Sequence, residues 1–212
     1  MPAAELTQMF LEAGQASGVV ATQLKANAAR VARIAYRLRA KPPRAVVTCA
    51  RGSSDHAATF AKYLIETRTG VLTASAALSV SSVYDARQEM GDVLYLAISQ
   101  SGKSPDLLAA VQAAKNAGAF TVALVNDERS PLAGLVDEVL PLHAGLELSV
   151  AATKSYIAAL AAIVQLVAAW TDDHDLTLAL KTLPGFLSTA WSLDWTPAVE
   201  RLSTASNLYV LG

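Results

Sequence analysis

The sequence predicts an α/β fold, a three-layer α/β/α sandwich with a five-stranded parallel sheet at its centre. The first observation is a set of short, β-rich apolar runs without polar alternation, as expected of strands buried on both faces. The second is that segments with apolar residues at helical spacing separate these runs. Such alternation favours a parallel sheet covered on both faces, with right-handed crossovers.

The first 44 residues are expected to form an N-terminal helical segment, because apolar residues recur at helical spacing over 18–40. Lys41-Pro42-Pro43 should end that helix, since a residue before proline avoids the helical conformation. The expected strands are 45–50, 71–74, 93–98, 120–125 and 138–142. The last is assigned to an edge because of its proline. Helices are expected over 57–65, 107–114 and 151–170.

Residues 45–170 are therefore the predicted α/β domain, and 171–206 a helical connector. Pro184-Gly185 and Pro197 are expected to break helices in the connector. Residues 207–212 resemble a strand that reaches a glycine turn, as 45–52 do. We interpret them as the first strand of a second copy of the domain; the alternative is a last strand of the same sheet.

The formal net charge of −1 and the absence of a Lys/Arg stripe give no reason to expect a nucleic-acid partner. Arg30, Arg33, Arg37 and Arg39 are interpreted as a solvated helix face. The most membrane-like segment, 156–170, is shorter than the roughly 20 residues that a membrane span needs. We therefore interpret it as a buried helix and expect no membrane partner.

Cys49 is the single cysteine, which excludes a disulfide framework and a multi-cysteine metal site. Its apolar surroundings predict a buried residue and fit a reducing, cytoplasmic setting. His56, His143 and His174 lack metal-ligand spacing. We expect neither a metal nor a cofactor.

The loop after the 93–98 strand carries the strongest functional signal. Ser99, Gln100, Ser101, Gly102 and Ser104 lie between a strand and a helix whose first turn points N–H groups toward the loop. Hydroxyl donors, a glycine that permits close approach and a helix N-terminus together predict phosphate binding. The alternative is a loop that only turns the chain, with Ser104 as N-cap.

Two further stretches complete the expected site. After the first strand, Gly52 leaves room for a ligand, while Ser53 and Ser54 offer hydroxyls, one of them expected as an N-cap. Before the 151–170 helix, small residues could form a close backbone wall. Glu147 in that stretch is a weak candidate for a catalytic carboxylate, and a surface or capping role is the alternative that we favour.

Taken in this order, residues 49–54, 99–104 and 147–154 resemble the sugar-isomerase (SIS) family over nearly the whole chain. The pattern is most similar to the isomerase half of glucosamine-6-phosphate synthases and to the glutamine-independent glucosamine-6-phosphate deaminases. The resemblance implies a flavodoxin-like sheet. It implies phosphate binding by Ser99, Gln100, Ser101, Ser104 and Ser53, and sugar contacts from Gly52, Ser54, Val150 and Ala151. Lys103 stands where the synthase usually has Glu, and would add a charge near the phosphate.

The resemblance further implies an isomerase or deaminase that acts on a hexose or hexosamine 6-phosphate, such as glucosamine 6-phosphate to fructose 6-phosphate and ammonia. Pro2 replaces the cysteine of the synthase's glutaminase domain, so we expect no glutaminase in this chain. In the family, the base and acid come from a second SIS domain. The alternatives are a non-catalytic phosphosugar sensor, a single-domain oligomeric isomerase, and the isomerase part of a glutamine–fructose-6-phosphate aminotransferase. We expect a homodimer.

Overall fold

The computed structural model of the chain describes residues 7–84 and 86–209. One parallel sheet with the order β2-β1-β3-β4-β5 forms its centre. The strands are β1 (Ala45–Ala50), β2 (Thr73–Ser75), β3 (Val93–Ser99), β4 (Phe120–Val125) and β5 (Glu138–Pro141). This confirms the predicted five-stranded parallel sheet, the flavodoxin-like order and the edge position of the proline-containing strand.

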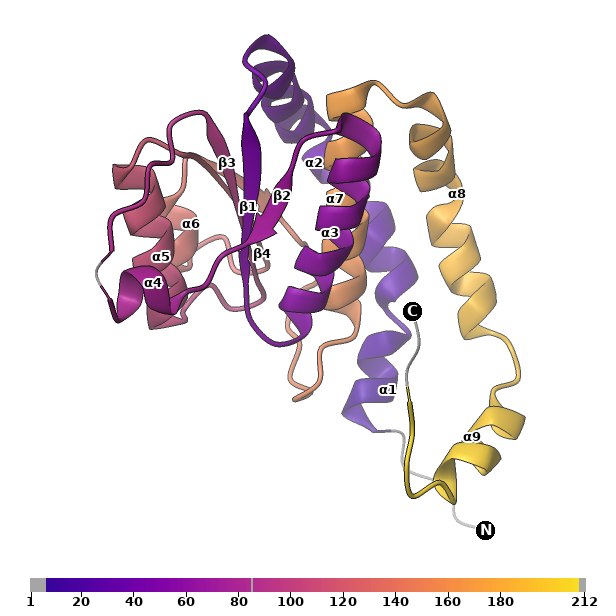
Figure 1. Cartoon of the computed structure of the whole chain (residues 1–212). Helices are drawn as coiled ribbons and strands as arrows, with labels where there is room; N and C mark the ends of the chain where they lie inside the picture. The colour runs from indigo at the N-terminus through magenta and orange to yellow at the C-terminus, as the bar shows by residue number, and fades with distance from the viewer. Residues whose placement is uncertain (1–6, 85, 210–212) are drawn as a thin grey trace.

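Helices cover both faces of the sheet (Figure 1). One face carries α2 (Ala16–Ala40), α3 (Ser53–Thr69) and α7 (Lys154–Thr171). The other carries α4 (Ser79–Ser82), α5 (Pro105–Asn116) and α6 (Pro131–Leu135). α8 (His174–Trp191) packs outside α2 and α7. α1 (Gln8–Ala13) precedes α2, and α9 (Thr196–Ser203) follows α8.

β3 is the central strand, and all seven of its residues are buried. Its side chains alternate between two cores: Leu94, Leu96 and Ile98 pack with α2, α3 and α7, whereas Tyr95 packs with α5 and α6. Cys49 lies in the second core and is fully buried, as predicted. Burial raises the pKa of its thiol to about 11, so it stays protonated at neutral pH.

α7 is the core helix that the sequence predicted. By length and composition it could cross a membrane, but 61% of it is buried inside this domain. Polar side chains of α2 satisfy backbone groups around it: Gln23 donates to the Ala158 carbonyl at 2.9 Å, and Asn27 to the Pro141 carbonyl at 2.8 Å. These bonds fix α2 against α7 and the end of β5.

The arginines of α2 lie on its solvent-exposed side, as expected, and they also contact neighbouring parts of the protein. Arg33 donates to the Glu138 carboxylate at 2.8 Å, and Arg30 to Glu128 at 3.0 Å. The Arg37 guanidinium lies 3.6 Å from the centre of the Phe120 ring. These contacts attach α2 to the β4–β5 edge of the sheet.

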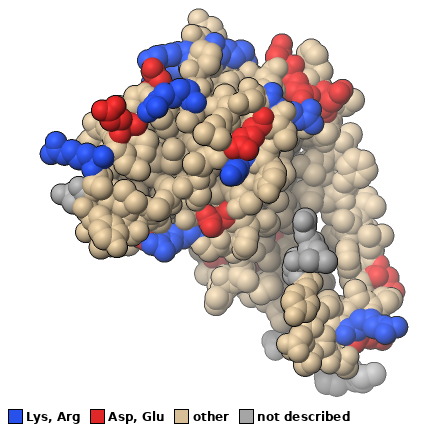
Figure 2. All heavy atoms as spheres, viewed as in Figure 1, with Lys and Arg blue, Asp and Glu red and all other residues tan. Residues whose placement is uncertain are grey.

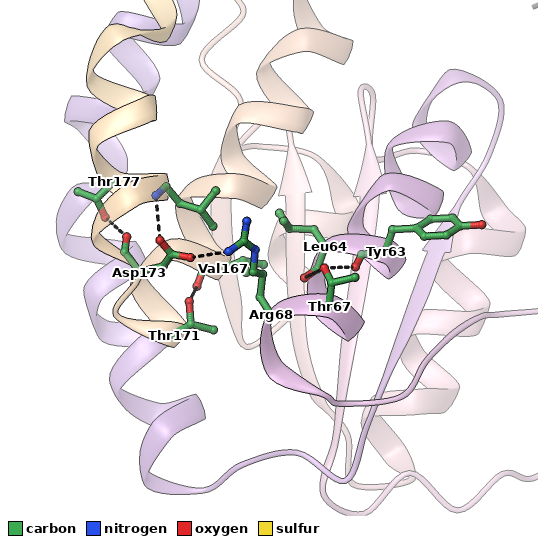
Figure 3. A network of polar contacts seen from close by, with 9 residues as sticks. Tyr63, Leu64, Thr67, Arg68, Val167, Thr171, Asp173 and Thr177 are labelled. Atoms are coloured by element: carbon green, nitrogen blue, oxygen red, sulfur yellow. Dashed lines mark hydrogen bonds and ion pairs between the residues drawn. The ribbon is translucent and has the colours of Figure 1, made fainter. Parts of the chain in front are cut away.

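The turn from α7 to α8 is fixed by α3 (Figure 3). Asp173 accepts from the Leu176 N–H at 2.9 Å as N-cap of α8, and pairs with Arg68 of α3 at 3.2 Å. Asp172 takes the left-handed conformation, with φ of 55°, which reverses the chain. α8 therefore returns along α2 and α7.

Several local expectations were wrong. The helices α4 and α6 were missed, whereas α1 lies within the helical segment expected over residues 1–44, and the core helix begins at Lys154 rather than residue 151. Pro184 lies inside α8 instead of ending a helix, and its carbonyl accepts from the Ser17 hydroxyl at 2.8 Å. Pro197 begins α9. Residues 207–209 form no strand, and 210–212 lie outside the described residues, so the second-domain interpretation stays a prediction.

The entry to β5 generates a stability prediction. The Asp137 carboxylate accepts from the N–H and hydroxyl of the fully buried Thr121, at 2.8 and 2.9 Å. Burial by itself would raise the pKa of Asp137, but these bonds and Lys115 outweigh it, and the pKa is lowered. Asp137→Ala should therefore lower the free energy of unfolding by about 1 kcal/mol at pH 7. The carboxylate is partly exposed, so water can take over some of its hydrogen bonds to Thr121, but not all of them.

The pH dependence has a defined sign. A carboxyl whose folded-state pKa is lowered stabilises above its ordinary pKa near 4, and this contribution is lost as the pH falls through the lowered value. In urea unfolding, the difference in free energy of unfolding between wild type and Asp137→Ala should become smaller as the pH falls. Glu200→Ala, which removes an exposed carboxylate from α9, is the control. Equal stability of wild type and Asp137→Ala at pH 7 would contradict the assignment.

Candidate functional site

A pocket of about 270 Å³ opens at the carboxyl ends of the strands. The strand order reverses at this point, because β1 has β2 on one side and β3 on its other side. Ligands of open parallel sheets bind at such switch points. Its walls come from the β1–α3 loop, the β3–α5 loop and the long loop before α7, which meet at the lower end of the sheet in Figure 1.

The β3–α5 loop forms the first wall. Ser99 ends β3, and its hydroxyl accepts from the Gly102 N–H at 3.0 Å, which closes the turn. Gln100, Ser101 and Ser104 line the pocket. Ser104 occupies the N-cap position of α5, yet its side chain makes no capping bond. Ser104 thus lines the pocket and does not have the capping role that was the alternative for it.

Gly102 fixes the depth of this loop. Its φ of +63° is a conformation that other residues adopt at a cost. A Cβ here would lie 2.7 Å from the Cβ of Ser130 and 2.9 Å from Val125 Cγ2, closer than atoms can pack. The Gly102 carbonyl also accepts from the Leu132 N–H at 3.2 Å. The loop is thus seated directly on β4 and α6.

The β1–α3 loop forms the second wall. Gly52 is the N-cap of α3, with φ of 58°, so neither Ser53 nor Ser54 is the N-cap, contrary to expectation. Both serines lie in the first turn of the helix and line the pocket. Arg51 also lines it and forms an ion pair with Asp106 of α5. The position of Arg51 directly after a strand was a signal that sequence reasoning did not use.

The third wall is the loop before α7. Glu147 is buried and accepts from the N–H groups of Thr153 and Ser155 at 3.0 and 3.2 Å, and from both of their hydroxyls. It therefore holds the first turn of α7, which is the capping role that was the alternative to catalysis. Ser149, Val150 and Ala152 complete this wall.

The electrostatics of the pocket favour an anion. α3 and α5 begin at its rim, so two helix N-termini direct partial positive charge toward it, whereas the first turn of α7 is occupied by the Glu147 carboxylate. Arg51 is balanced by Asp106, and Lys103 pairs with Asp127 at 3.7 Å, outside the lining residues. The positive contribution at the phosphate loop thus comes mainly from the backbone dipoles of α3 and α5, an arrangement that suits a phosphate.

The structure brings most of the predicted site residues together. Those that line the pocket are Ser53, Ser54, Ser99, Gln100, Ser101, Ser104, Glu147 and Val150. Gly52 and Ala151 do not line it, although each directly precedes a lining residue, Ser53 and Ala152 respectively. The lining residues that were not predicted are Arg51, Ile98, Leu107, Ser149 and Ala152.

Larger hollows lie away from the carboxyl ends of the strands. One of about 860 Å³ is lined in part by polar residues such as Arg87 and Glu89, but it lies beside the start of β3 and the end of α5. A groove of about 550 Å³ between α2, α7 and α8 is lined mainly by apolar residues, including Leu24, Val31 and Leu180. It lies away from the carboxyl ends of the strands. Converging polar groups rather than size mark a ligand site, so the smaller pocket is the candidate.

Comparison with known proteins agrees with this geometry. A sequence model of the SIS domain matches residues 40–169. The chain is 40% identical over 138 residues to an isomerizing glutamine–fructose-6-phosphate aminotransferase of Thermus thermophilus, covering 64% of this chain and 22% of that protein. The chain therefore spans about a fifth of that relative's length.

Solved structures give the same result. A protein of Silicibacter pomeroyi DSS-3 named as a phosphosugar isomerase superimposes with a TM-score of 0.90 at 43% identity, over 93% of this chain and 61% of that one. The NanR protein of Vibrio vulnificus, complexed with ManNAc-6P, shares the fold at a TM-score of 0.62 and 20% identity, over 82% of this chain and 69% of that one. Because the SIS model covers more than half of the chain, the protein belongs to the SIS domain family and is homologous to the isomerase part of these aminotransferases.

Proposed function

We propose that this domain binds a hexose or hexosamine 6-phosphate in the pocket between β1 and β3. The phosphate lies in the loop 99–104, where Ser99, Gln100, Ser101 and Ser104 surround it, with Ser53 assisting. The sugar lies against Ser54 and Val150, beside the backbone of Gly52 and Ala151. The observation that carries this proposal is that serine side chains and the N-termini of α3 and α5, which have no side-chain capping bond, meet in one pocket.

The groups that line the pocket match those that a sugar phosphate needs. A phosphate needs several donors and a positive field within a small space. The first turns of α3 and α5 supply N–H groups, while Ser53, Ser101 and Ser104 supply hydroxyls. The pocket also has a side free of positive side chains, formed by Ser149, Val150 and Ala152, which suits an uncharged polyol.

The reaction that we propose is aldose–ketose isomerisation or deamination of an amino-sugar phosphate, such as glucosamine 6-phosphate to fructose 6-phosphate and ammonia. The names of the homologous aminotransferases and of the Silicibacter structure support this class. Proton transfer between C1 and C2 requires a base and an acid. Among the lining residues of this pocket Glu147 is the carboxylate, and its bonds to Thr153 and Ser155 make it a structural group.

That engagement of Glu147 favours a second candidate, phosphosugar binding without turnover by this chain. A coupled assay for ammonia and fructose 6-phosphate with the purified protein separates the two. Product formation with glucosamine 6-phosphate supports the deaminase. Tight binding of the same compound without product supports the binding function.

We also infer a cytoplasmic homodimer. α8, α9 and the turn between them expose Leu178, Phe186, Trp195, Val199 and Leu202, and Figure 2 shows this flank as mostly uncharged surface. Apolar surface of this kind marks an interaction site, and a second copy of the chain is the occupant that we infer. The buried, reduced Cys49 fits a reducing compartment.

The phosphate position generates the first binding prediction. Ser101→Ala removes one hydroxyl donor from the pocket and should weaken the binding of fructose 6-phosphate by about 1–3 kcal/mol, or roughly 5- to 150-fold. Ser188→Ala, which alters an exposed serine of α8, should leave the affinity unchanged. Isothermal titration calorimetry measures both. Wild-type affinity in Ser101→Ala would mean that the phosphate lies elsewhere.

The seating of the loop generates the second. Gly102→Ala combines an unfavourable backbone conformation with a clash against Ser130, and should destabilise the protein by about 2–4 kcal/mol and abolish phosphosugar binding. Gly70→Ala is the matched control, because Gly70 has a φ of +71° with open space around it, far from the pocket. It should lose about 1–2 kcal/mol of stability but keep full affinity. Thermal unfolding measures the stability and calorimetry measures the phosphosugar affinity. Wild-type affinity in Gly102→Ala would refute the claim that close packing of Gly102 on Ser130 positions the phosphate loop.

A further inference from the structure

The third wall of the pocket lacks apolar anchoring. Residues 145–150 form neither helix nor strand. The side chains of Leu146, Leu148 and Val150 are exposed, and their residues retain 75%, 66% and 107% of full exposure. Burial of apolar surface therefore does not hold this loop in place, and polar contacts must do so.

A carboxylate from the N-terminal helix α1 supplies such contacts. Glu12 is 1% exposed and accepts from the N–H groups of Leu148 at 2.6 Å and Ser149 at 3.1 Å. The hydrogen bond from Leu148, followed by Ser149, lowers the pKa of Glu12 to about 2. The group is thus ionised at neutral pH, and bonds to an ionised acceptor are about twice as strong as neutral ones.

Lys154 holds the same loop from its other end. This residue begins α7 and is 3% exposed. Its Nζ donates to the Leu146 carbonyl at 2.6 Å and to Oε1 of Gln15, between α1 and α2, at 2.7 Å. A buried ammonium is costly unless it is hydrogen-bonded, so these two acceptors fix the position of Lys154. Glu12, Gln15 and Lys154 together hold the loop at residues 146, 148 and 149.

We propose that Glu12 and Lys154, with Gln15, are positioning residues that clamp the loop 146–150 against the sugar end of the ligand. The inference rests on the proposed function. The phosphate loop is held independently, by Ser99 and by the contact of Gly102 with α6. The clamp therefore acts on recognition of the sugar and leaves recognition of the phosphate unchanged.

The experiment compares two ligands on Glu12→Gln, which keeps one acceptor and loses the charge. By NMR titration, the affinity for glucosamine 6-phosphate should fall by about tenfold, while that for inorganic phosphate should change less than about twofold. Met9→Ala, on the exposed side of α1, should change neither affinity. Lys154→Met should reproduce the selective loss. Equal weakening of both ligands would indicate general destabilisation and overturn the clamp, as would two unchanged affinities.

Amide hydrogen exchange tests the clamp without any ligand. The Leu148 and Ser149 amides of the wild type should be protected at pH 7 although they lie in an exposed loop, and Glu12→Gln should lose that protection. The Gly102 amide, bonded to Ser99, should be equally protected in both proteins. Unprotected Leu148 and Ser149 amides in the wild type overturn the clamp. Absence of phosphosugar binding by a wild type with protected amides would refute the proposed function alone.

Discussion

The parallel pairing of β1 with β3 is the constraint that positions the pocket. The two strands run side by side in register from Ala45–Val93 to Ala50–Ile98. Because the chain continues from β1 to β2 on one side and from β3 to β4 on the other, the loops after β1 and β3 diverge and leave a space between them. α3 and α5 then begin on opposite faces of the sheet, with the first turns of both at the pocket. The positive field of the pocket is thus a consequence of strand order and not of charged side chains.

Different interactions hold the three walls of the pocket in place. Strand order and the close packing of Gly102 against Ser130 and Val125 fix the first two walls. The third wall is held by the bonds of Glu147 to the start of α7 and also by contacts from the chain's first helix. That helix is itself packed on α8, where the Phe10 and Trp191 rings lie 4.5 Å apart. The sugar side of the pocket is consequently connected to the terminal helices, whereas the phosphate side is not.

Sequence patterns predicted the parts of the structure whose causes are local. The all-apolar run of β3 reflects burial on both faces, and the serines and Gly102 after it are the residues that a phosphate loop requires. What the patterns missed depends on distant partners. In the sequence Glu12 cannot be told from an ordinary helical glutamate, because its partners, the Leu148 and Ser149 amides, lie far away along the chain. The assignment of a serine N-cap for α3 failed because Gly52 takes that position with a positive φ.

The central claim is that the β1–β3 pocket binds a sugar phosphate, and backbone NMR of the labelled domain tests it most directly. Fructose 6-phosphate should shift amide resonances in three segments, 51–55, 99–107 and 146–153, with the largest changes at the first turns of α3 and α5. Unphosphorylated fructose at the same concentration should shift few or none. Shifts confined to the groove between α2, α7 and α8, or equal responses to both sugars, would contradict the account.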